Sequence, residues 1–405
     1  MTASHSRTVL VLNAGSSSLK FAIFTPSDDA DGLADLCRGQ IDGIGAVPRF
    51  KASSPDGAIS DKLDLDPVQV SAQPGAMAFL LGWLETHFPG LVGLTVGHRV
   101  VHGGVSYSAP VVIDPTVRDA LNAFKPLAPL HQPHNLSGID AAIEAFPDAA
   151  QVACFDTAFH RNHPWVNDTF ALPRSFYEEG VRRYGFHGLS YEYISDRLKG
   201  SWSELAAGRV VVAHLGNGAS MCAIKDGISV GSTMGFSALD GLPMGTRCGQ
   251  IDPGVLLYLM GERGMSADEI SNLLYKESGL KGLSGIGHDM RELEASDDPR
   301  AAEAIAYFVF RIRRELGAMA SVLQGLDGII FTGGIGENSA HIRSEVLTGT
   351  EWLGIEMDKS ANAASAEVIS TPTSRVKALV LKTNEELMIA RHCLRLTEGR
   401  AAAAE

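Results

Sequence analysis

The clearest hydrophobic pattern in the chain is a pair of apolar stretches joined by a polar turn. Residues 9–12 are apolar, residues 13–18 read NAGSSS, and an extended, apolar-rich pattern resumes at residues 19–24. This arrangement predicts two strands connected by a tight turn. The turn offers backbone N–H groups, hydroxyls and Lys20 to an anionic phosphate, and Gly15 permits close approach of the backbone. The alternative is an ordinary hairpin turn without a ligand.

A second copy of this pattern lies in the other half of the chain. Subtracting 201 from the residue numbers aligns Gly216 with Gly15 and residues 223–224 with residues 22–23. Self-similarity at half the chain length predicts two related domains that arose by duplication. Each domain would carry one phosphate-binding turn, and the two turns would face each other across a cleft.

Elsewhere short apolar runs alternate with helical patterns, which predicts a layered α/β fold. Residues 49–74 are polar and rich in Ser, Asp, Pro and Gly, so we expect a peripheral insertion there. The expected strands are 36–44, 94–101, 151–154, 328–331 and 376–381, and the expected helices are 77–88, 115–124, 136–146, 253–262, 266–275, 289–295, 299–324 and a closing helix from 383.

Three segments carry more information than their expected secondary structure. Helix 299–324 has apolar residues at spacings of three and four, which predicts one buried stripe. The glycine-rich segment 332–338 lies between a buried strand and a helix, which is typical of a loop that brings a nucleotide close to the backbone. In the closing helix, Thr383 and Glu386 fit a capping box, which leaves Glu385 free to bind a hard cation such as Mg²⁺.

Composition narrows the class of protein. The 405 residues are enough for two domains, and the formal net charge of −13 argues against a nucleic-acid surface. Five scattered cysteines include no CxxC pair, which fits a reducing cytoplasm. No apolar signal core precedes the first strand. Apolar runs such as residues 76–81 are far shorter than the ~20 residues of a membrane-spanning helix.

Two arginines stand out in this acidic chain. Arg99 lies in the segment 98–104 (HRVVHGG), near the end of an expected strand, and Arg247 lies between glycines in the segment 245–249. We interpret both segments as cationic clusters, because arginine binds carboxylate or phosphate in a bidentate manner. The alternative for each arginine is a surface salt bridge.

Three further side chains could carry chemistry. Asp156 follows a strand among aromatic residues, so it could orient a base or hold a metal through water, or it could cap a turn. His187 lies between glycines, but a single histidine is often structural. His131 lies in residues 129–134, where two prolines predict an extended segment that could also be a rigid connector. No histidine cluster has zinc-like spacing.

Taken together, the motifs resemble those of the acetokinase family of acetate kinases, which is related to sugar kinases, actin and heat-shock chaperone ATPases. The matching motifs run in order from residue 9 to residue 391: NAGSSSLKF, GHRVVHGG, FDTAFH, RYGFHGLSY, HLGNGAS, MGTRCGQIDPG, FTGGIGENS and TNEELMIAR. The resemblance implies two actin-like, ribonuclease H-like domains with an interdomain active-site cleft. We expect the domains at residues 1–155 and 156–383, with the closing helix 384–405 packed back on the first.

The resemblance also implies an activity, a reversible in-line transfer of the ATP γ-phosphoryl group to acetate, with Mg²⁺ (or Mn²⁺) and a homodimer. Asn13 and Glu385 would be associated with the metal, while Asp156, His187 and Arg247 would be catalytic. The implied substrate-binding residues are Arg99, Val101, Leu130, His131 and Phe186. The implied nucleotide-binding residues are Ser16, Ser18, Lys20, His214, Leu215, Gly216, Asn217, Gly218, Asp289, Met290, Arg291, Gly334, Ile335, Gly336, Glu337 and Asn338.

The chemistry supports this allocation of roles. A metaphosphate-like transition state is stabilised mainly by positive charge and positioning. Acetate is already ionised at pH 7, so no general base is needed. We therefore favour an orienting role for Asp156, with the family's acid/base or Mg²⁺-positioning assignment as the alternative. A sugar kinase is disfavoured because a hydroxyl acceptor needs a base, and a non-catalytic ATP clamp of the actin type would not need two substrate arginines.

Two positions depart from the family pattern. Ala238 stands in residues 236–241, where many relatives have proline, and the smaller side chain could admit another methylene. Such a change is worth only ~1–3 kcal/mol of discrimination, so propionate, or another short-chain acid, is an alternative substrate. Tyr191 stands where many relatives carry histidine, and the resemblance gives it no role.

Overall fold

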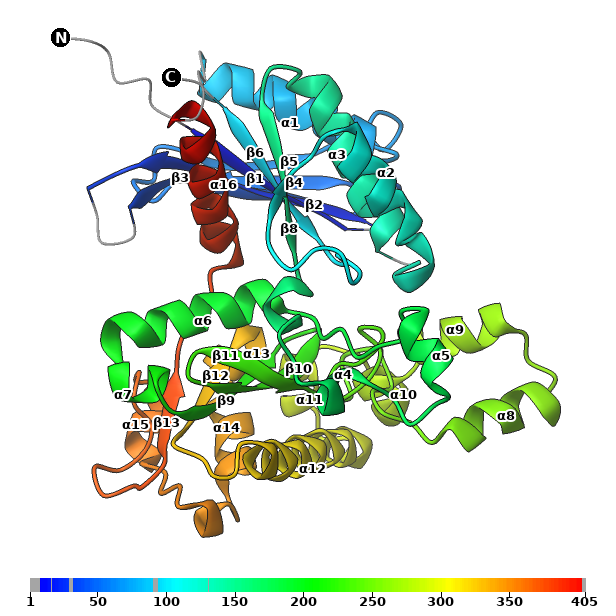
Figure 1. The fold of residues 1–405 in the computed structure, drawn as a ribbon, viewed down its shortest axis with the longest axis vertical. Helices are drawn as coiled ribbons and strands as arrows, with labels where there is room; N and C mark the ends of the chain where they lie inside the picture. The colour runs from blue at the N-terminus through cyan, green and yellow to red at the C-terminus, as the bar shows by residue number, and fades with distance from the viewer. Residues whose placement is uncertain (1–7, 16, 29–31, 90–93, 130, 403–405) are drawn as a thin grey trace. The chain divides into compact units, whose positions relative to one another are not determined.

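The computed structural model describes residues 8–15, 17–28, 32–89, 94–129 and 131–402, and these form two compact units (Figure 1). Unit 1 contains the described residues up to Ala158 together with those from Asn384 onward, and unit 2 is Phe159–Thr383. None of the helices in these residues combines the length and the apolar character needed to cross a bilayer.

Unit 1 is built on a mixed sheet that, within the described residues, has eight strands in the order β5-β4-β3-β2-β1-β6-β8-β7. Strands β1 to β5 pair antiparallel, whereas β1, β6 and β8 run parallel to one another. The strands are β1 (Val9–Ala14), β2 (Ser18–Pro26), β3 (Leu33–Asp42), β4 (Arg49–Ser53), β5 (Ser60–Asp64), β6 (Thr95–Val100), β7 (Val111–Val112) and β8 (Ala150–Phe155).

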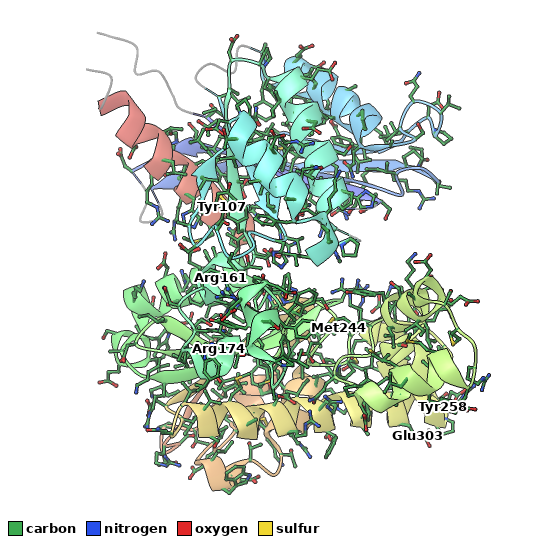
Figure 2. The ribbon with its side chains drawn as sticks, turned by 45° about the vertical axis from the view of Figure 1, so that its right-hand side comes forward. Tyr107, Arg161, Arg174, Met244, Tyr258 and Glu303 are labelled. Carbon is green, nitrogen blue, oxygen red and sulfur yellow. The ribbon has the colours of Figure 1, made fainter. Side chains whose placement is uncertain are left out.

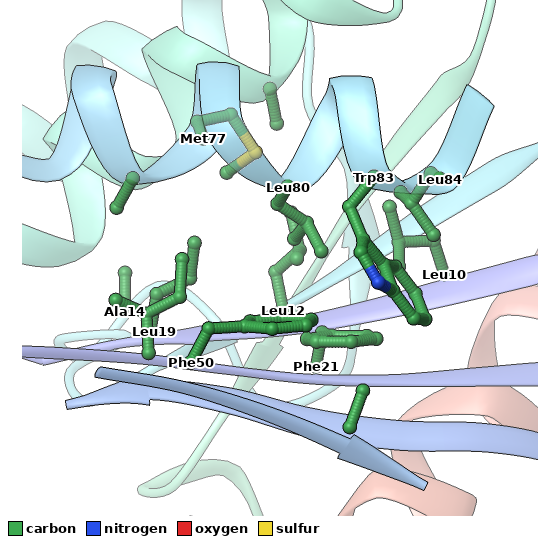
Figure 3. Packing of buried hydrophobic residues seen from close by; sticks show 14 of the residues in the cluster. Leu10, Leu12, Ala14, Leu19, Phe21, Phe50, Met77, Leu80, Trp83 and Leu84 are labelled. Atoms are coloured by element: carbon green, nitrogen blue, oxygen red, sulfur yellow. The ribbon is translucent and has the colours of Figure 1, made fainter. Parts of the chain in front are cut away.

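Helices cover both faces of this sheet. Its helices are α1 (Gln73–His87), α2 (Pro115–Ala123), α3 (Gln132–Ala145) and α16 (Glu385–Ala402), with a 3-10 turn at Lys125–Leu127. Figure 3 shows α1 placing Leu80 and Trp83 over Leu12 and Phe21 of the sheet. α16 packs against β1 and β6, so closely that a Cβ on Gly97 would meet Ile389 at 2.5 Å.

Unit 2 repeats the central part of this topology. Its described strands are β9 (Arg209–Leu215), β10 (Ala219–Lys225), β11 (Ile228–Ser232), β12 (Gly328–Thr332) and β13 (Lys377–Val380). Their order, β11-β10-β9-β12-β13, matches β3-β2-β1-β6-β8 of unit 1, with the same antiparallel hairpin followed by parallel strands. The repeated strand order is the one that a duplication predicts.

The offset of 201 holds only for the first strand of each hairpin. Val11 pairs with Ala22 in unit 1, whereas the equivalent Val212 pairs with Cys222 in unit 2. The second strands therefore correspond at an offset of 200 (222 − 22), because the turn of unit 2 is one residue shorter. The predicted alignment of residues 223–224 with residues 22–23 was therefore wrong by one residue.

The described helices of unit 2 are α4 (Trp165–Asp168), α5 (Arg174–Glu178), α6 (Gly188–Ser201), α7 (Ser203–Ala206), α8 (Pro253–Gly261), α9 (Ala267–Lys276), α10 (Gly279–Ser284), α11 (Met290–Glu294), α12 (Pro299–Val322), α13 (Gly333–Asn338), α14 (Ala340–Leu347) and α15 (Lys359–Ala363), with 3-10 turns at Ala158–His160 and Glu351–Leu353. Helices α6, α7, α12 and α13 pack against the sheet of this unit. The predicted stripe of α12 is buried at Ile305, Phe308, Val309, Ile312, Leu316, Met319 and Leu323.

Residues 49–74 contain β4 and β5, which lie at one edge of the sheet of unit 1 and have no counterpart in the strand order of unit 2, as expected for a peripheral insertion. Two other local predictions were wrong. Residues 132–134 are helical and not extended, because Pro133 lies in the first turn of α3, where a missing N–H costs nothing. The segment 332–338 is mostly the short helix α13 and not a loop.

The closing helix has a different cap from the predicted one. Asn384 Oδ1 accepts the backbone N–H of Leu387 at 3.1 Å, so Asn384 and not Thr383 caps α16. The backbone N–H of Thr383 donates to Glu337 instead. Glu386 lies 3.4 Å from Arg38 Nη1, and Glu385 begins the helix.

Candidate active site

In unit 1, the ends of two parallel strands bring Arg99 and Asp156 together. Arg99 lies near the end of β6 and Asp156 directly follows β8, the neighbouring strand. Arg99 Nε donates to Asp156 Oδ1 at 3.0 Å, and Arg99 Nη2 donates to Oδ2 at 2.6 Å. Asp156 is buried, so this bidentate ion pair compensates a carboxylate that is removed from water.

A second carboxylate approaches the same guanidinium. Glu385 Oε2, at the start of α16, lies 3.7 Å from Arg99 Nε. Burial raises the pKa of Glu385, and the positive charge of Arg99 opposes that rise. Burial acts to lower the pKa of Arg99, but Asp156 and Glu385 outweigh it and hold that pKa above its usual value. The two bonds to Asp156 use Nε and Nη2, and neither uses Nη1.

Two buried amide side chains brace the turn after β1. Gln73 Nε2 donates to the carbonyls of Gly15 (2.6 Å) and Ser18 (3.0 Å). Asn135 Nδ2 donates to Ala14 O, while its Oδ1 accepts the N–H of Val101. Sequence reasoning missed both residues, although an amide at a buried helix position is a detectable signal.

The segment 98–104 is not a cationic cluster, and that interpretation was wrong. His98 is buried, its Nε2 donates to Gln151 Oε1 at 2.7 Å, and burial lowers its pKa to about 4. His102 is also buried, and its Nδ1 accepts the N–H of Gly104, which requires that nitrogen to be unprotonated. Arg99 is therefore the cation of this segment.

In unit 2, His187 occupies a constrained position before α6. Its φ of 58° is left-handed, which is uncommon for a residue other than glycine. His187 Nδ1 is hydrogen-bonded to Ser220 Oγ at 2.8 Å, and its ring stacks on His214 with centroids 4.4 Å apart. A Cβ added to Gly218 would lie 3.2 Å from Nε2, so that nitrogen faces the turn between β9 and β10.

Arg247 lies on an irregular loop that is tied to the same turn. The N–H of Gly245 donates to Asn217 O, and Arg247 Nη1 donates to Ala238 O at 3.0 Å. Met244, labelled in Figure 2, is buried in this loop. The contacts therefore join Arg247, the segment that carries Ala238 and the turn at residues 216–218.

A pocket of about 470 Å³ in unit 2 brings together eight of the predicted nucleotide-binding residues. Gly216 and Asn217 come from the β9–β10 turn, and the others come from α11, α13 and the residues around them. The lining residues are Gly216, Asn217, His288, Asp289, Met290, Arg291, Glu294, Gly334, Ile335, Asn338 and Ser339. His288, Glu294 and Ser339 were not predicted.

The other predicted nucleotide-binding residues of unit 2 do not line this pocket. His214 stacks on His187, and Leu215 and Gly336 are buried. Glu337 Oε1 accepts the N–H groups of Gly333 and Thr383, so it holds the end of β12. Within the pocket wall, Arg291 donates to Asp289, and this hydrogen bond lowers the pKa of Asp289 to about 2.

A buried arginine that sequence reasoning missed holds α13 beside the pocket. Arg343 Nη1 donates to the carbonyls of Gly336 and Glu337, and its other nitrogens donate to Asn362 and Ser365. These bonds satisfy carbonyls at the end of a short helix, where backbone acceptors otherwise lack partners. Because burial of an arginine is not a local property of sequence, no motif signals it.

The remaining predicted residues are Phe186 of unit 2, several residues of unit 1 and two that lie outside the described residues. Ser16 and Leu130 lie outside them. Asn13 is half-buried on β1, opposite the exposed Lys20 of β2. The remaining members are Ser18, Val101 and His131, which are half-buried, and Phe186 of unit 2, which is buried. Across the described residues, no group of three or more His, Cys, Asp or Glu side chains is arranged to hold a metal ion.

Comparisons with known proteins agree on one family. The model of the acetokinase family matches residues 8–391. An acetate kinase of Methylocella silvestris is 59% identical over 403 residues, covering 98% of this chain and all of the relative, and one of Rhodopseudomonas palustris is 54% identical over 394 residues, covering 96% and 98%.

Solved structures agree with this. A crystal structure of Porphyromonas gingivalis acetate kinase has a TM-score of 0.86 at 38% identity, covering 96% of this chain and 99% of that chain. A propionate kinase from Francisella tularensis has a TM-score of 0.87 at 36% identity, covering 95% and 98%.

The buried, neutral His98 predicts a loss of stability in acid. Its folded pKa of about 4 lies below the usual 6.5, so the unfolded chain binds more protons between these values and stability falls as pH falls through that window. We expect the unfolding temperature of His98→Gln to fall less between pH 7 and pH 5 than that of the wild type. His341→Gln, at an exposed position, is the control, and an equal acid sensitivity of all three proteins would contradict the prediction.

Proposed function

The chain belongs to the acetokinase family, and we propose on this basis that it transfers the γ-phosphoryl group of ATP reversibly to acetate, giving acetyl phosphate and ADP. Its two sheets have the actin-like ATPase fold of its structural relatives. The observation that carries the proposal is Arg99, which is oriented by the buried Asp156.

Arg99 would bind the carboxylate of acetate. Asp156 accepts the Nε proton and one of the two Nη2 protons, so the N–H groups of Nη1 and the second N–H of Nη2 are left for a substrate oxygen. Asp156 accepts two hydrogen bonds from a cation, which stabilises its ionised form and fixes the arginine in one orientation. Since acetate needs no deprotonation at pH 7, this geometry supports an orienting role for Asp156.

Unit 2 would bind ATP and stabilise the phosphoryl group in flight. Gly216, Asp289 and Gly334 line the pocket, so backbone atoms border an open cavity in which a nucleotide could bind. His187 Nε2 faces the turn at Gly218, where a hydrogen bond to a phosphoryl oxygen would be favourable. Arg247 would add a positive charge to a transition state whose negative charge is spread over three oxygens.

The residues of unit 1 also fit a magnesium ion. Glu385 lies beside Arg99, and Asn13 would add an amide oxygen, so the donors would be the hard oxygen ligands that Mg²⁺ prefers. A Mg²⁺ site that acts on a nucleotide needs only one or two protein carboxylates, because water and phosphate oxygens complete it. When bound, the ion would neutralise charge on the phosphates.

Propionate is the second candidate substrate, and the position of Ala238 favours it. Its carbonyl accepts a hydrogen bond from Arg247, so this small side chain lies next to a residue that we place in the reaction. The expected discrimination is only ~1–3 kcal/mol per methylene, so turnover of both acids would be compatible with the site.

Acyl-phosphate formation tests the activity directly. With Mg-ATP and hydroxylamine as the trap, we expect acetate to give hydroxamate with a higher kcat/KM than propionate, and propionate a higher value than butyrate. A preference for propionate over acetate would favour the second candidate. Absence of acid-dependent ADP release with all three acids would contradict the proposal.

Substitution of the two arginines should have different effects. In Arg99→Ala the KM for acetate should rise about 10- to 100-fold while the KM for ATP changes little, because a charge-assisted hydrogen bond to the acid is lost. In Arg247→Ala kcat should fall about 100- to 1,000-fold. Steady-state kinetics with Arg300→Ala, at an exposed position, gives the control. Equal increases of both KM values in Arg99→Ala would contradict its role.

We further propose that the chain works as a cytoplasmic homodimer. The cysteines are scattered without a CxxC pair, as expected in a reducing compartment. α8 exposes Leu257 (69%), Tyr258 (52%, labelled in Figure 2) and Met260 (54%), and large exposed apolar patches mark interaction sites.

The variant Leu257→Lys should shift the protein from dimer to monomer, because it places a charge in this apolar patch. Trp352→Lys, also exposed but on a 3-10 turn away from α8, should leave the dimer intact. Sedimentation equilibrium measures both, and a monomeric wild type would contradict the proposal.

A further inference from the structure

Tyr191, a residue to which the family resemblance gives no role, is connected to His187 through one side chain. Its hydroxyl is hydrogen-bonded to Ser220 Oγ, and the same oxygen lies 2.8 Å from His187 Nδ1. Tyr191 and Ser220 are both completely buried. Two elements, α6 and β10, therefore supply a short chain of polar groups that ends on the imidazole.

The imidazole itself is held firmly on its other sides. His187 precedes α6 in a left-handed conformation, and its ring stacks on His214 at 4.4 Å. His214 Nδ1 is in turn hydrogen-bonded to Ser190 Oγ at 2.8 Å. One edge of the His187 ring thus faces Ser220 and the opposite edge, with Nε2, faces Gly218.

The order of protons along this chain decides what Nε2 can do. Ser220 has a single hydroxyl proton. If Tyr191 donates to Ser220 Oγ and the serine donates its own proton to His187 Nδ1, that nitrogen must be the unprotonated one. In a neutral imidazole the remaining proton is on Nε2, so Nε2 becomes a donor that points toward the turn.

The opposite order of donors would leave Nε2 unable to donate a hydrogen bond to an anion. If His187 Nδ1 donated to Ser220 and the serine to Tyr191, a neutral His187 would present a lone pair at Nε2. Simultaneous protonation of His187 and the stacked His214 is disfavoured, because two imidazolium rings at 4.4 Å would repel each other. The hydroxyl of Tyr191 therefore matters for the protonation pattern of His187 as well as for packing.

We propose that Tyr191 is a positioning residue that acts through Ser220 to hold His187 as the tautomer protonated on Nε2. The role of that proton rests on the proposed function, in which Nε2 donates to the phosphoryl group. The tautomer itself is a property of the free protein and is measured without substrate.

The test is ¹⁵N NMR of histidine-labelled protein, with the His187 signals identified by their loss in His187→Gln. The wild type should show a protonated Nε2 and an unprotonated Nδ1. In Tyr191→Phe and Ser220→Ala these shifts should move toward the average of two tautomers. Tyr193→Phe, a buried tyrosine on the same helix, is the matched control and should leave them unchanged.

Kinetics gives the second measurement. Tyr191→Phe should lower kcat about 3- to 10-fold, as expected for the loss of one neutral hydrogen bond, while the KM values for acetate and ATP change less than twofold. Unchanged His187 shifts in both Tyr191→Phe and Ser220→Ala would overturn this inference whatever the activity. Absence of acyl-phosphate formation by the wild type would overturn the proposed function and leave the tautomer result standing.

Discussion

The ion pair between Asp156 and Arg99 is the interaction on which the site of unit 1 depends. Parallel neighbours β6 and β8 end side by side, so the topology delivers both residues to the same edge of the sheet. The pair also explains how a carboxylate can be buried there, since an uncompensated charge would be strongly destabilising. Glu385 lies beside this pair because α16 packs on β1 and β6.

The two copies of the duplicated topology differ in the surroundings of the turn after their first strand. Both units have a hairpin turn after the first strand, in which the N–H of Gly15 donates to Ser18 O and the N–H of Gly216 donates to Gly218 O. In unit 1 the side chain of Gln73, from helix α1, donates a hydrogen bond to the turn. In unit 2 the shorter turn contributes to the wall of a pocket. The same backbone turn thus occurs in two settings that differ in the side chains around it.

Local periodicity was sufficient to predict the hairpins and the buried stripe of α12, because those signals lie within short windows. It failed for β5, whose side chains are almost all exposed, so the edge strand has no apolar alternation. It also failed for His98, since the burial that keeps it neutral comes from distant segments. Tyr191 shows the same limit: its partner, Ser220, is 29 residues away, and only folding brings the pair to His187.

The central claim, that Asp156 orients Arg99 and does not act as a base, is tested most directly by a double-mutant cycle on kcat/KM for acetate. The cycle uses Asp156→Asn, Arg99→Gln and the double variant. If Asp156 acts through Arg99, Asp156→Asn should cost about 10- to 100-fold in the wild type and little in the Arg99→Gln background. Equal costs in both backgrounds would contradict the account, because Asp156 would then act independently of Arg99.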